Sequence, residues 1–167
     1  ASADVSSIRT LEKALDKNIL DDLNVAVAKG LLDKIGALYR FSHDRIQEAT
    51  YNMMPDQARR LFHFSFGLSL ASLSIDEGDD GILFIAVNQL NHGGPAAVQD
   101  PSQSFTVADM NLRAGKKAIQ MADFKIASSY FDHGISFLRN NHWMEHYDLS
   151  LELFELAAKC ALTNGDH

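Results

Sequence analysis

The residues best suited to chemistry are His43, Asp44 and Arg45, which follow one another at the start of a predicted helix. Ser42 precedes them at the position of a helix N-cap, after residues whose alternation is typical of a half-buried strand. Free N–H groups and the macrodipole make a helix N-terminus attractive to anions. An imidazole there can donate a hydrogen bond to a phosphate oxygen. The segment therefore predicts a phosphate-sensing histidine, with capping and packing of the helix as the structural alternative.

Arginines and histidines elsewhere also have spacings that chemistry could use. Arg59 and Arg60 could pair with an acidic surface, and Arg45 with a phosphate, although solvated helix positions are the simpler interpretation. His142 and His146 are four residues apart, which would place two imidazoles on one helix face, as in some zinc sites. They lack a third ligand and the HExxH pattern, so we expect no metal there. The remaining interior histidines are interpreted as isolated structural or exposed residues: His63, His92 and His133.

The sequence lacks the motifs that would let it catalyse a reaction by itself. It contains no GxxxxGK[ST] loop to cradle phosphates, no GxGxxG loop and no GxSxG nucleophile turn. Adjacent carboxylates such as Asp21 and Asp22 point apart and are typical of solvated caps. We therefore expect a non-catalytic segment, because no nucleophile, base and oxyanion site come together.

The same residues carry a family resemblance. FSHDRIQEATY, with GLLDKIGALYR before it, resembles the winged-helix end of signal-transducing P-loop ATPases of the STAND and AAA type. It is most similar to multidomain proteins in which such an ATPase lies between a serine/threonine protein kinase and histidine-kinase modules. The resemblance continues through NLRAGKKAIQMADFKIASSYFDHGISFL and WMEHYDLSLELFELAAKCA to the helical-repeat arm of those proteins.

The resemblance implies a nucleotide-sensing role for the residues at the helix start. His43 would contact the terminal phosphate of ADP bound in an ATPase core of the same chain, and Asp44 would support the local geometry. Arg45 could reach a phosphate or an acidic residue of that core. The core would hold ATP or ADP with Mg, and the present segment would bind no cofactor alone.

Composition limits the class of protein and its partners. Of the 167 residues, 46% are hydrophobic and 22% charged, which fits one compact globular unit or two small ones. The formal net charge of −7 argues against nucleic acid or an anionic membrane as the main partner. No apolar run approaches the roughly 20 residues that span a bilayer, and no signal peptide is visible. The single cysteine, Cys160, excludes an internal disulfide and favours a reducing, cytoplasmic location. The polar ends, without an initiator Met, predict a piece of a longer protein.

The predicted fold class is mainly α, beginning with a small winged-helix unit over residues 1–54. Apolar spacing predicts helices over 5–16 and 19–29, with Gly30 at the C′ position. A short β-hairpin over 31–35 and 38–41 turns at Gly36 and Ala37. A third helix over 43–53 then carries the phosphate-sensing segment.

A TPR-like helical array is predicted over residues 55–167. Pro55 suits the N1 position of a helix over 55–74 with apolar stripes on two sides, followed by a turn at 77–81 and a helix over 82–91. We expect a loop from 92 to 103 and a capping box at 106–109 that opens a helix to Ala122. Asp123 caps the next helix, and a last helix covers about 144–162. Small and aromatic residues match offsets of a tetratricopeptide hairpin, without its Trp and Pro: Gly115, Ala127, Phe131 and Gly134.

Three functions are consistent with this organisation. The first is a regulatory segment of a signalling ATPase, in which the winged helix holds the nucleotide-bound core. The arm would receive a signal from an unidentified protein or small molecule and release the core. The second is a stand-alone helical scaffold for protein interaction, which binds a peptide in a concave groove. The third is a winged-helix DNA-binding regulator, which the acidic balance makes the weakest.

Overall fold

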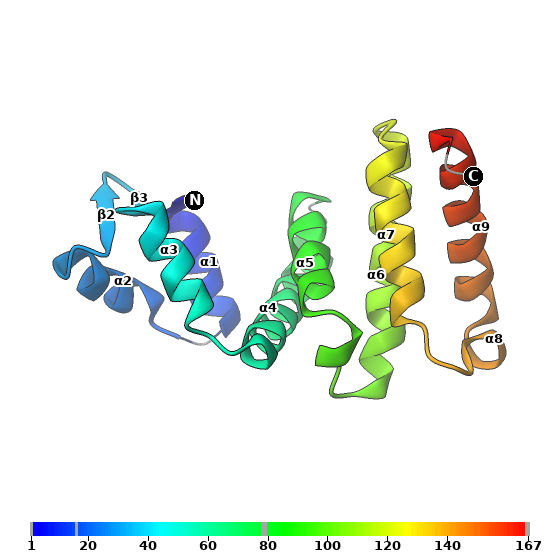
Figure 1. Cartoon of the computed structure of the whole chain (residues 1–167), viewed down its shortest axis with the longest axis horizontal. Helices are drawn as coiled ribbons and strands as arrows, with labels where there is room; N and C mark the ends of the chain where they lie inside the picture. Colours follow the sequence, from blue (N-terminus) through cyan, green and yellow to red (C-terminus); the bar gives the residue numbers. More distant parts are fainter. Residues whose placement is uncertain (1, 16, 78–79, 166–167) are drawn as a thin grey trace. The chain divides into compact units, whose positions relative to one another are not determined.

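The structure, a computed structural model, describes residues 2–15, 17–77 and 80–165. These residues form mainly α-helices with one small antiparallel sheet (Figure 1), as the sequence predicts. The chain divides into two compact units, unit 1 over Ala1–Arg59 and unit 2 over Arg60–His167, whereas the sequence analysis places its boundary between residues 54 and 55. No helix in the described ranges has both the length and the apolar character needed to cross a bilayer.

Unit 1 is a three-stranded sheet with helices connecting and following its strands. In chain order its elements are β1 (Ser2–Asp4), α1 (Val5–Leu15), α2 (Ile19–Ala28), β2 (Leu32–Ile35), β3 (Leu38–Phe41) and α3 (Asp44–Asn52). The predicted helices and hairpin agree with these bounds to within one residue at each end. Gly30 and Gly36 have φ of +71° and +59°, as expected for a helix C′ residue and a tight hairpin turn.

The strand β1 was absent from the sequence prediction. It pairs antiparallel with β3, with Ala3 opposite Tyr39, so β3 is the central strand in the order β1-β3-β2. Its three residues show no apolar alternation, because the pairing is made by backbone groups. The Val5 N–H continues the contact by donating to the Ala37 carbonyl oxygen at 2.9 Å.

The core of unit 1 is built around Tyr39 of β3. The side chains of Ile8, Leu32 and Tyr39 are buried, while Arg40 points to solvent, which confirms the half-buried strand pattern. The Tyr39 hydroxyl donates to Asn24 Oδ1 at 2.7 Å, so the ring and its polar end are both fixed. The rigid central strand ends at Phe41, immediately before the predicted sensing segment.

Unit 2 is entirely helical in its described residues. Its elements are α4 (Asp56–Glu77), which begins in unit 1, α5 (Asp80–Gly93), the 3₁₀-helix η1 (Pro95–Ala97), α6 (Pro101–Gln120), α7 (Phe124–Phe137), α8 (His142–Glu145) and α9 (Tyr147–Asn164). The helices α6, α7 and α9 lie side by side (Figure 1), and α7 packs against both of the others.

Two glycines let α7 lie close to its neighbours. A Cβ added at Gly115 on α6 would be 2.3 Å from Cε1 of Phe131, which is completely buried on α7. A Cβ added at Gly134 on α7 would be 2.7 Å from Cδ2 of Leu153 on α9. The small and aromatic positions identified in the sequence are therefore sites of close helix packing.

The start of α6 corrects the sequence prediction. The helix begins at Pro101 within the expected loop, because the Asp100 carboxylate accepts the Ser102 N–H at 3.0 Å as an N-cap. Thr106, the predicted opening of this helix, lies inside it and donates to the Ser102 carbonyl oxygen at 3.4 Å. The sequence signal for this helix start is Asp100-Pro101, an N-cap residue followed by proline at the N1 position. At the other end, Ala122 adopts φ +60° and lies beyond the helix that was predicted to include it.

The remaining differences concern helix faces and ends. Pro55 precedes α4 and does not open it. Both apolar stripes of α4 contain buried residues, Leu70 on one and Phe64 with Ala71 on the other, but Phe62 on the first stripe is half exposed. The predicted turn at 77–81 falls partly outside the described residues, because residues 78 and 79 are not described and α5 begins at Asp80. Asp123 caps α7 as predicted, accepting from the Ile126 N–H at 3.0 Å. The last predicted helix is two helices, α8 and α9, and α9 buries the stripe containing Leu153.

Candidate functional site

The predicted phosphate-sensing segment lies where β3 ends and α3 begins. The N-cap of α3 is His43 rather than Ser42, with extended backbone (φ −144°, ψ 142°) and a carbonyl oxygen that accepts the Ile46 N–H at 2.9 Å. The Ser42 hydroxyl instead donates to Asp33 Oδ1 on β2 at 3.2 Å. Ser42 is therefore held by the sheet, and this bond fixes the chain one residue before the N-cap.

His43, Asp44 and Arg45 are exposed at the start of α3. Together with Ile46 they line an open pocket of about 510 Å³. Within the described residues, their side chains form no hydrogen bond or ion pair, and the His43 ring does not cap the helix. An imidazole, a carboxylate and a guanidinium are thus displayed together and free to bind a group from elsewhere.

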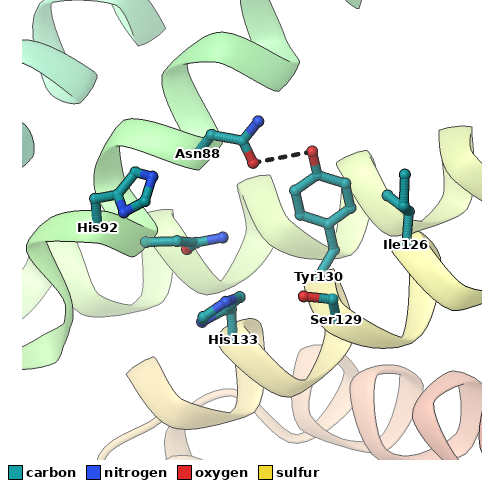
Figure 2. Close-up of a pocket in the computed structure, with 7 residues that line it drawn as sticks. Asn88, His92, Ile126, Ser129, Tyr130 and His133 are labelled. Carbon is teal, nitrogen blue, oxygen red and sulfur yellow. Dashed lines mark hydrogen bonds between the residues drawn. The ribbon is translucent and has the colours of Figure 1, made fainter. Parts of the chain in front are cut away.

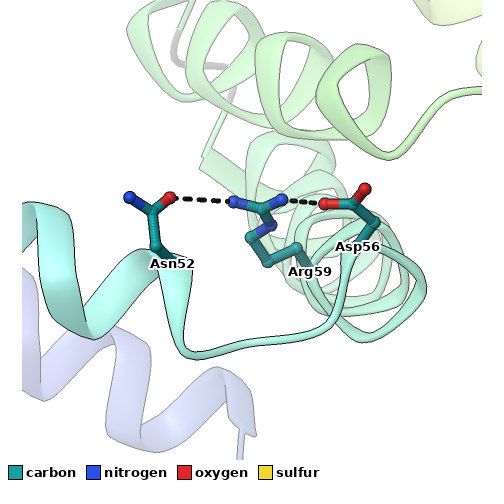
Figure 3. Close-up of polar contacts among 3 residues, drawn as sticks. All are labelled: Asn52, Asp56 and Arg59. Atoms are coloured by element: carbon teal, nitrogen blue, oxygen red, sulfur yellow. Dashed lines mark hydrogen bonds and ion pairs between the residues drawn. The ribbon is translucent and has the colours of Figure 1, made fainter.

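Arg59 is engaged within unit 1 instead of being displayed for an acidic surface. Its guanidinium donates to Asn52 Oδ1 at 3.4 Å and pairs with Asp56 (Figure 3). The guanidinium carbon also lies 4.7 Å from the centre of the Tyr51 ring. These contacts connect the end of α3 to the start of α4, so the role of Arg59 is structural. Arg60 is exposed and makes no such contact in the part of the chain that the structure describes.

A second pocket lies in unit 2 between α5 and α7 (Figure 2). Its volume is about 470 Å³, and facing sides of the two helices line it: Asn88, Asn91, His92, Ile126, Ser129, Tyr130 and His133. Along each helix the lining positions recur after three or four residues, at 88, 91 and 92 on α5 and at 126, 129, 130 and 133 on α7, which is the spacing of one helix face. Sequence patterns do not predict this pocket, because its halves are about 40 residues apart along the chain.

The hydroxyl of Tyr130 holds one side of this pocket in place. It donates to Asn88 Oδ1 at 3.1 Å, which joins α7 to α5 (Figure 2). Burial raises the pKa of the Tyr130 phenol, and the bond to Asn88 partly offsets this effect. The hydroxyl therefore remains a hydrogen-bond donor at neutral pH, and the Asn88 oxygen remains its acceptor. The NH₂ group of Asn88 is left for a ligand.

One lining residue of the pocket, Asn91, is held by a second carboxamide, that of Asn111. Asn91 Nδ2 donates to Asn111 Oδ1 at 2.8 Å, and Asn111 Nδ2 donates to Asn91 Oδ1 at 3.0 Å. Asn111 lies on α6, is completely buried, and also donates to the Val107 carbonyl oxygen at 3.0 Å. A buried carboxamide with its donors and acceptor satisfied is rigid, so Asn91 is held in place before any ligand arrives.

The histidines interpreted as isolated are near one another in unit 2. The rings of His63 on α4 and His92 on α5 have centroids 5.4 Å apart, and His63 Nδ1 is 2.7 Å from Gln89 Oε1. His92 and His133 line the same pocket from opposite sides (Figure 2). The prediction that these residues are isolated is therefore wrong, since helix packing joins residues that the sequence separates widely.

The pair His142 and His146 has structural contacts. His142 Nδ1 is 2.8 Å from the hydroxyl oxygen of Ser150, and the His146 ring stacks on Phe105 with centroids 3.7 Å apart. His142 lies in α8, whereas His146 is the N-cap of α9, so the two do not share a continuous helix face. In the described ranges, no three His, Cys, Asp or Glu side chains are grouped as metal ligands.

Comparisons with protein-family models, with curated proteins and with solved structures find no match to the chain. The two sites are therefore interpreted from their own geometry. The site in unit 1 displays charged side chains at a helix start. The pocket in unit 2 offers hydrogen-bonding groups without any Lys, Arg, Asp or Glu in its described lining.

Proposed function

We propose that this chain is a non-catalytic regulatory segment of a multidomain signalling ATPase linked to protein-kinase modules. In this proposal unit 1 is the winged-helix part, which contacts a nucleotide-bound core of the same chain. Unit 2 is the arm that receives a signal from a protein or a small molecule. The nucleotide, ATP or ADP with Mg, is held by the core and not by these residues.

The proposal is supported mainly by three side chains at the start of α3. His43, Asp44 and Arg45 are exposed and unpaired among the described residues, whereas Ser42 just before them is bonded to Asp33 of the sheet. A partner that supplies an anionic phosphate would satisfy the imidazole and the guanidinium at once. The helix N-terminus adds favourable electrostatics for that anion.

The test is ADP retention by the natural polypeptide that contains this segment, with His43→Leu as the variant. Loss of a hydrogen bond to a charged phosphate, about 1.5–3 kcal/mol, predicts ADP dissociation at least tenfold faster. Glu48→Leu on the exposed side of the same helix is the matched control and should retain ADP normally. Equal retention by the His43→Leu variant, or a natural polypeptide that binds no adenine nucleotide, would refute the proposal.

A stand-alone helical scaffold for protein interaction is the second candidate. The pocket between α5 and α7 favours it, since hydrogen-bonding groups from two helices converge there without help from unit 1. The two candidates differ in their dependence on nucleotide. A scaffold should bind its partner equally well with ADP present or absent, whereas a regulatory segment should bind it with a different affinity.

A further inference from the structure

We infer that the pocket between α5 and α7 binds the carboxamide side chain of an Asn or Gln in an extended peptide from a partner protein. The inference extends the proposed role of unit 2 in receiving a signal. The ligand class follows from the charge, the free hydrogen-bonding groups and the length of the pocket.

The charge of the lining favours a neutral ligand. Its described residues include no Lys, Arg, Asp or Glu, and its only basic groups are the imidazoles of His92 and His133. Removing a charged group from water without an opposing charge is costly, whereas a neutral amide loses less. A ligand group without formal charge is therefore the better match.

The free groups of the lining match an amide in particular. The Asn88 NH₂ group can donate, because Tyr130 occupies only the oxygen of that carboxamide. The Ser129 hydroxyl and the His133 ring make no side-chain hydrogen bond within the described residues, and each can both donate and accept. A peptide unit or a carboxamide also offers one N–H side and one C=O side. Ligand and pocket are thus complementary in both donors and acceptors.

The length of the pocket favours a peptide over a small free amide. The lining residues of α7 run from Ile126 to His133, which spans roughly 10 Å at 1.5 Å per helical residue. An extended chain rises about 3.3 Å per residue, so about three peptide residues fit along this length. The volume of about 470 Å³ lies within the range of well-formed ligand sites, and the exposed Asn88, His92 and Ser129 leave the pocket open to solvent.

The test uses the whole 167-residue chain, labelled with ¹⁵N and titrated by NMR with capped tetrapeptides. The neutral probe is acetyl-Ser-Asn-Gln-Ser-amide, and the anionic probe of the same shape is acetyl-Ser-Asp-Glu-Ser-amide. We expect the neutral probe to shift backbone amide signals of α5 and α7 and the side-chain NH₂ signal of Asn88. The anionic probe should bind at least tenfold more weakly. N-methylacetamide, which carries one amide, should bind at least tenfold more weakly as well.

The discriminating variant is Asn88→Asp, which keeps an oxygen acceptor for Tyr130 but removes the NH₂ donor and adds a negative charge. It should weaken binding of the neutral probe about tenfold. Asn140→Asp makes the same change at an exposed residue after α7, outside this pocket, and should bind the probe normally.

Three results would overturn the inference. They are no signal shifts with the neutral probe at 5 mM, equal binding of the anionic probe or of N-methylacetamide, or equal binding by the Asn88→Asp and Asn140→Asp variants. None of these measurements involves a nucleotide. A negative result in the peptide titration therefore does not bear on the ADP experiment with His43→Leu. A negative result in the ADP experiment likewise does not bear on the peptide titration.

Discussion

Asn91 on α5 and Asn111 on α6 donate to each other, so two hydrogen bonds of 2.8 and 3.0 Å join the helices through a single pair of side chains. Asn91 lines the pocket between α5 and α7, and Asn111 is completely buried. A buried carboxamide that loses its partner keeps its desolvation cost without compensation. The pair is therefore a specific connection between α5 and α6 in addition to their apolar contact.

A double-mutant cycle measures this connection. Asn111→Ala should lower the free energy of unfolding by about 2–3 kcal/mol, because it leaves Asn91 unpaired and creates a small cavity. Asn91→Ala should cost about 1–2 kcal/mol. The double variant should be less destabilised than the sum, with a coupling energy of about 1 kcal/mol in urea unfolding. Simple additivity of the two changes would show that the pair contributes no specific coupling.

The close approach of Gly115 to Phe131 makes a second prediction. Gly115→Ala should destabilise unit 2 by about 2 kcal/mol or more, because its Cβ would overlap the Phe131 ring at 2.3 Å. In Gly165→Ala the new Cβ meets nothing within 4 Å, and only the left-handed backbone at φ +78° is strained. This control should cost about 1 kcal/mol. Equal losses measured by chemical denaturation would contradict the steric explanation.

Acid should reveal the contribution of the Asp100 cap on α6. Its hydrogen bonds to the backbone and hydroxyl of Ser102 lower the pKa of Asp100 in the folded state. A lowered folded-state pKa stabilises the fold at neutral pH, and this contribution is lost as the pH falls below about 4. Asp100→Asn should therefore lower the thermal midpoint at pH 7, and the difference from the unsubstituted chain should shrink by pH 3. A difference that is constant with pH would exclude an ionised cap.

The single thiol offers a direct measure of opening at α9. Burial raises the pKa of Cys160, and the negative charge of Asp132 raises it further, so the thiolate is disfavoured in the folded state. We expect native Cys160 to react with a disulfide reagent at pH 8 at least a hundredfold more slowly than in 6 M guanidinium. Rapid labelling of the native chain would mean that α9 separates readily from α7.

Local patterns predicted most helices and the hairpin, but they missed features that depend on partners distant in sequence. The bounds of α1, α2 and β3 follow from apolar spacing and turn glycines, which are properties of neighbouring residues. The strand β1 was missed because backbone bonding to β3 requires no particular side chain.

The same difference between local features and features set by distant residues holds for the two candidate sites. His43, Asp44 and Arg45 were identified because they are consecutive at a helix start, although the N-cap was placed one residue too early. The pocket in unit 2 was missed because Asn88 and Tyr130 meet only after α5 and α7 have packed. The residue pattern within one helix does not show which residues of another helix it contacts. The histidines of the pocket are therefore predicted as isolated residues.

The short strand β1 has a practical consequence for anyone who shortens the chain. Among the residues that the structure describes, only Ser2–Asp4 pair with the outer edge of β3. A version starting at Val5 would expose the backbone N–H and C=O groups of Tyr39 along that edge, next to the half-exposed side chain of Leu38. Uncovered edges recruit other strands, so such a version would self-associate through β3 and precipitate on concentration.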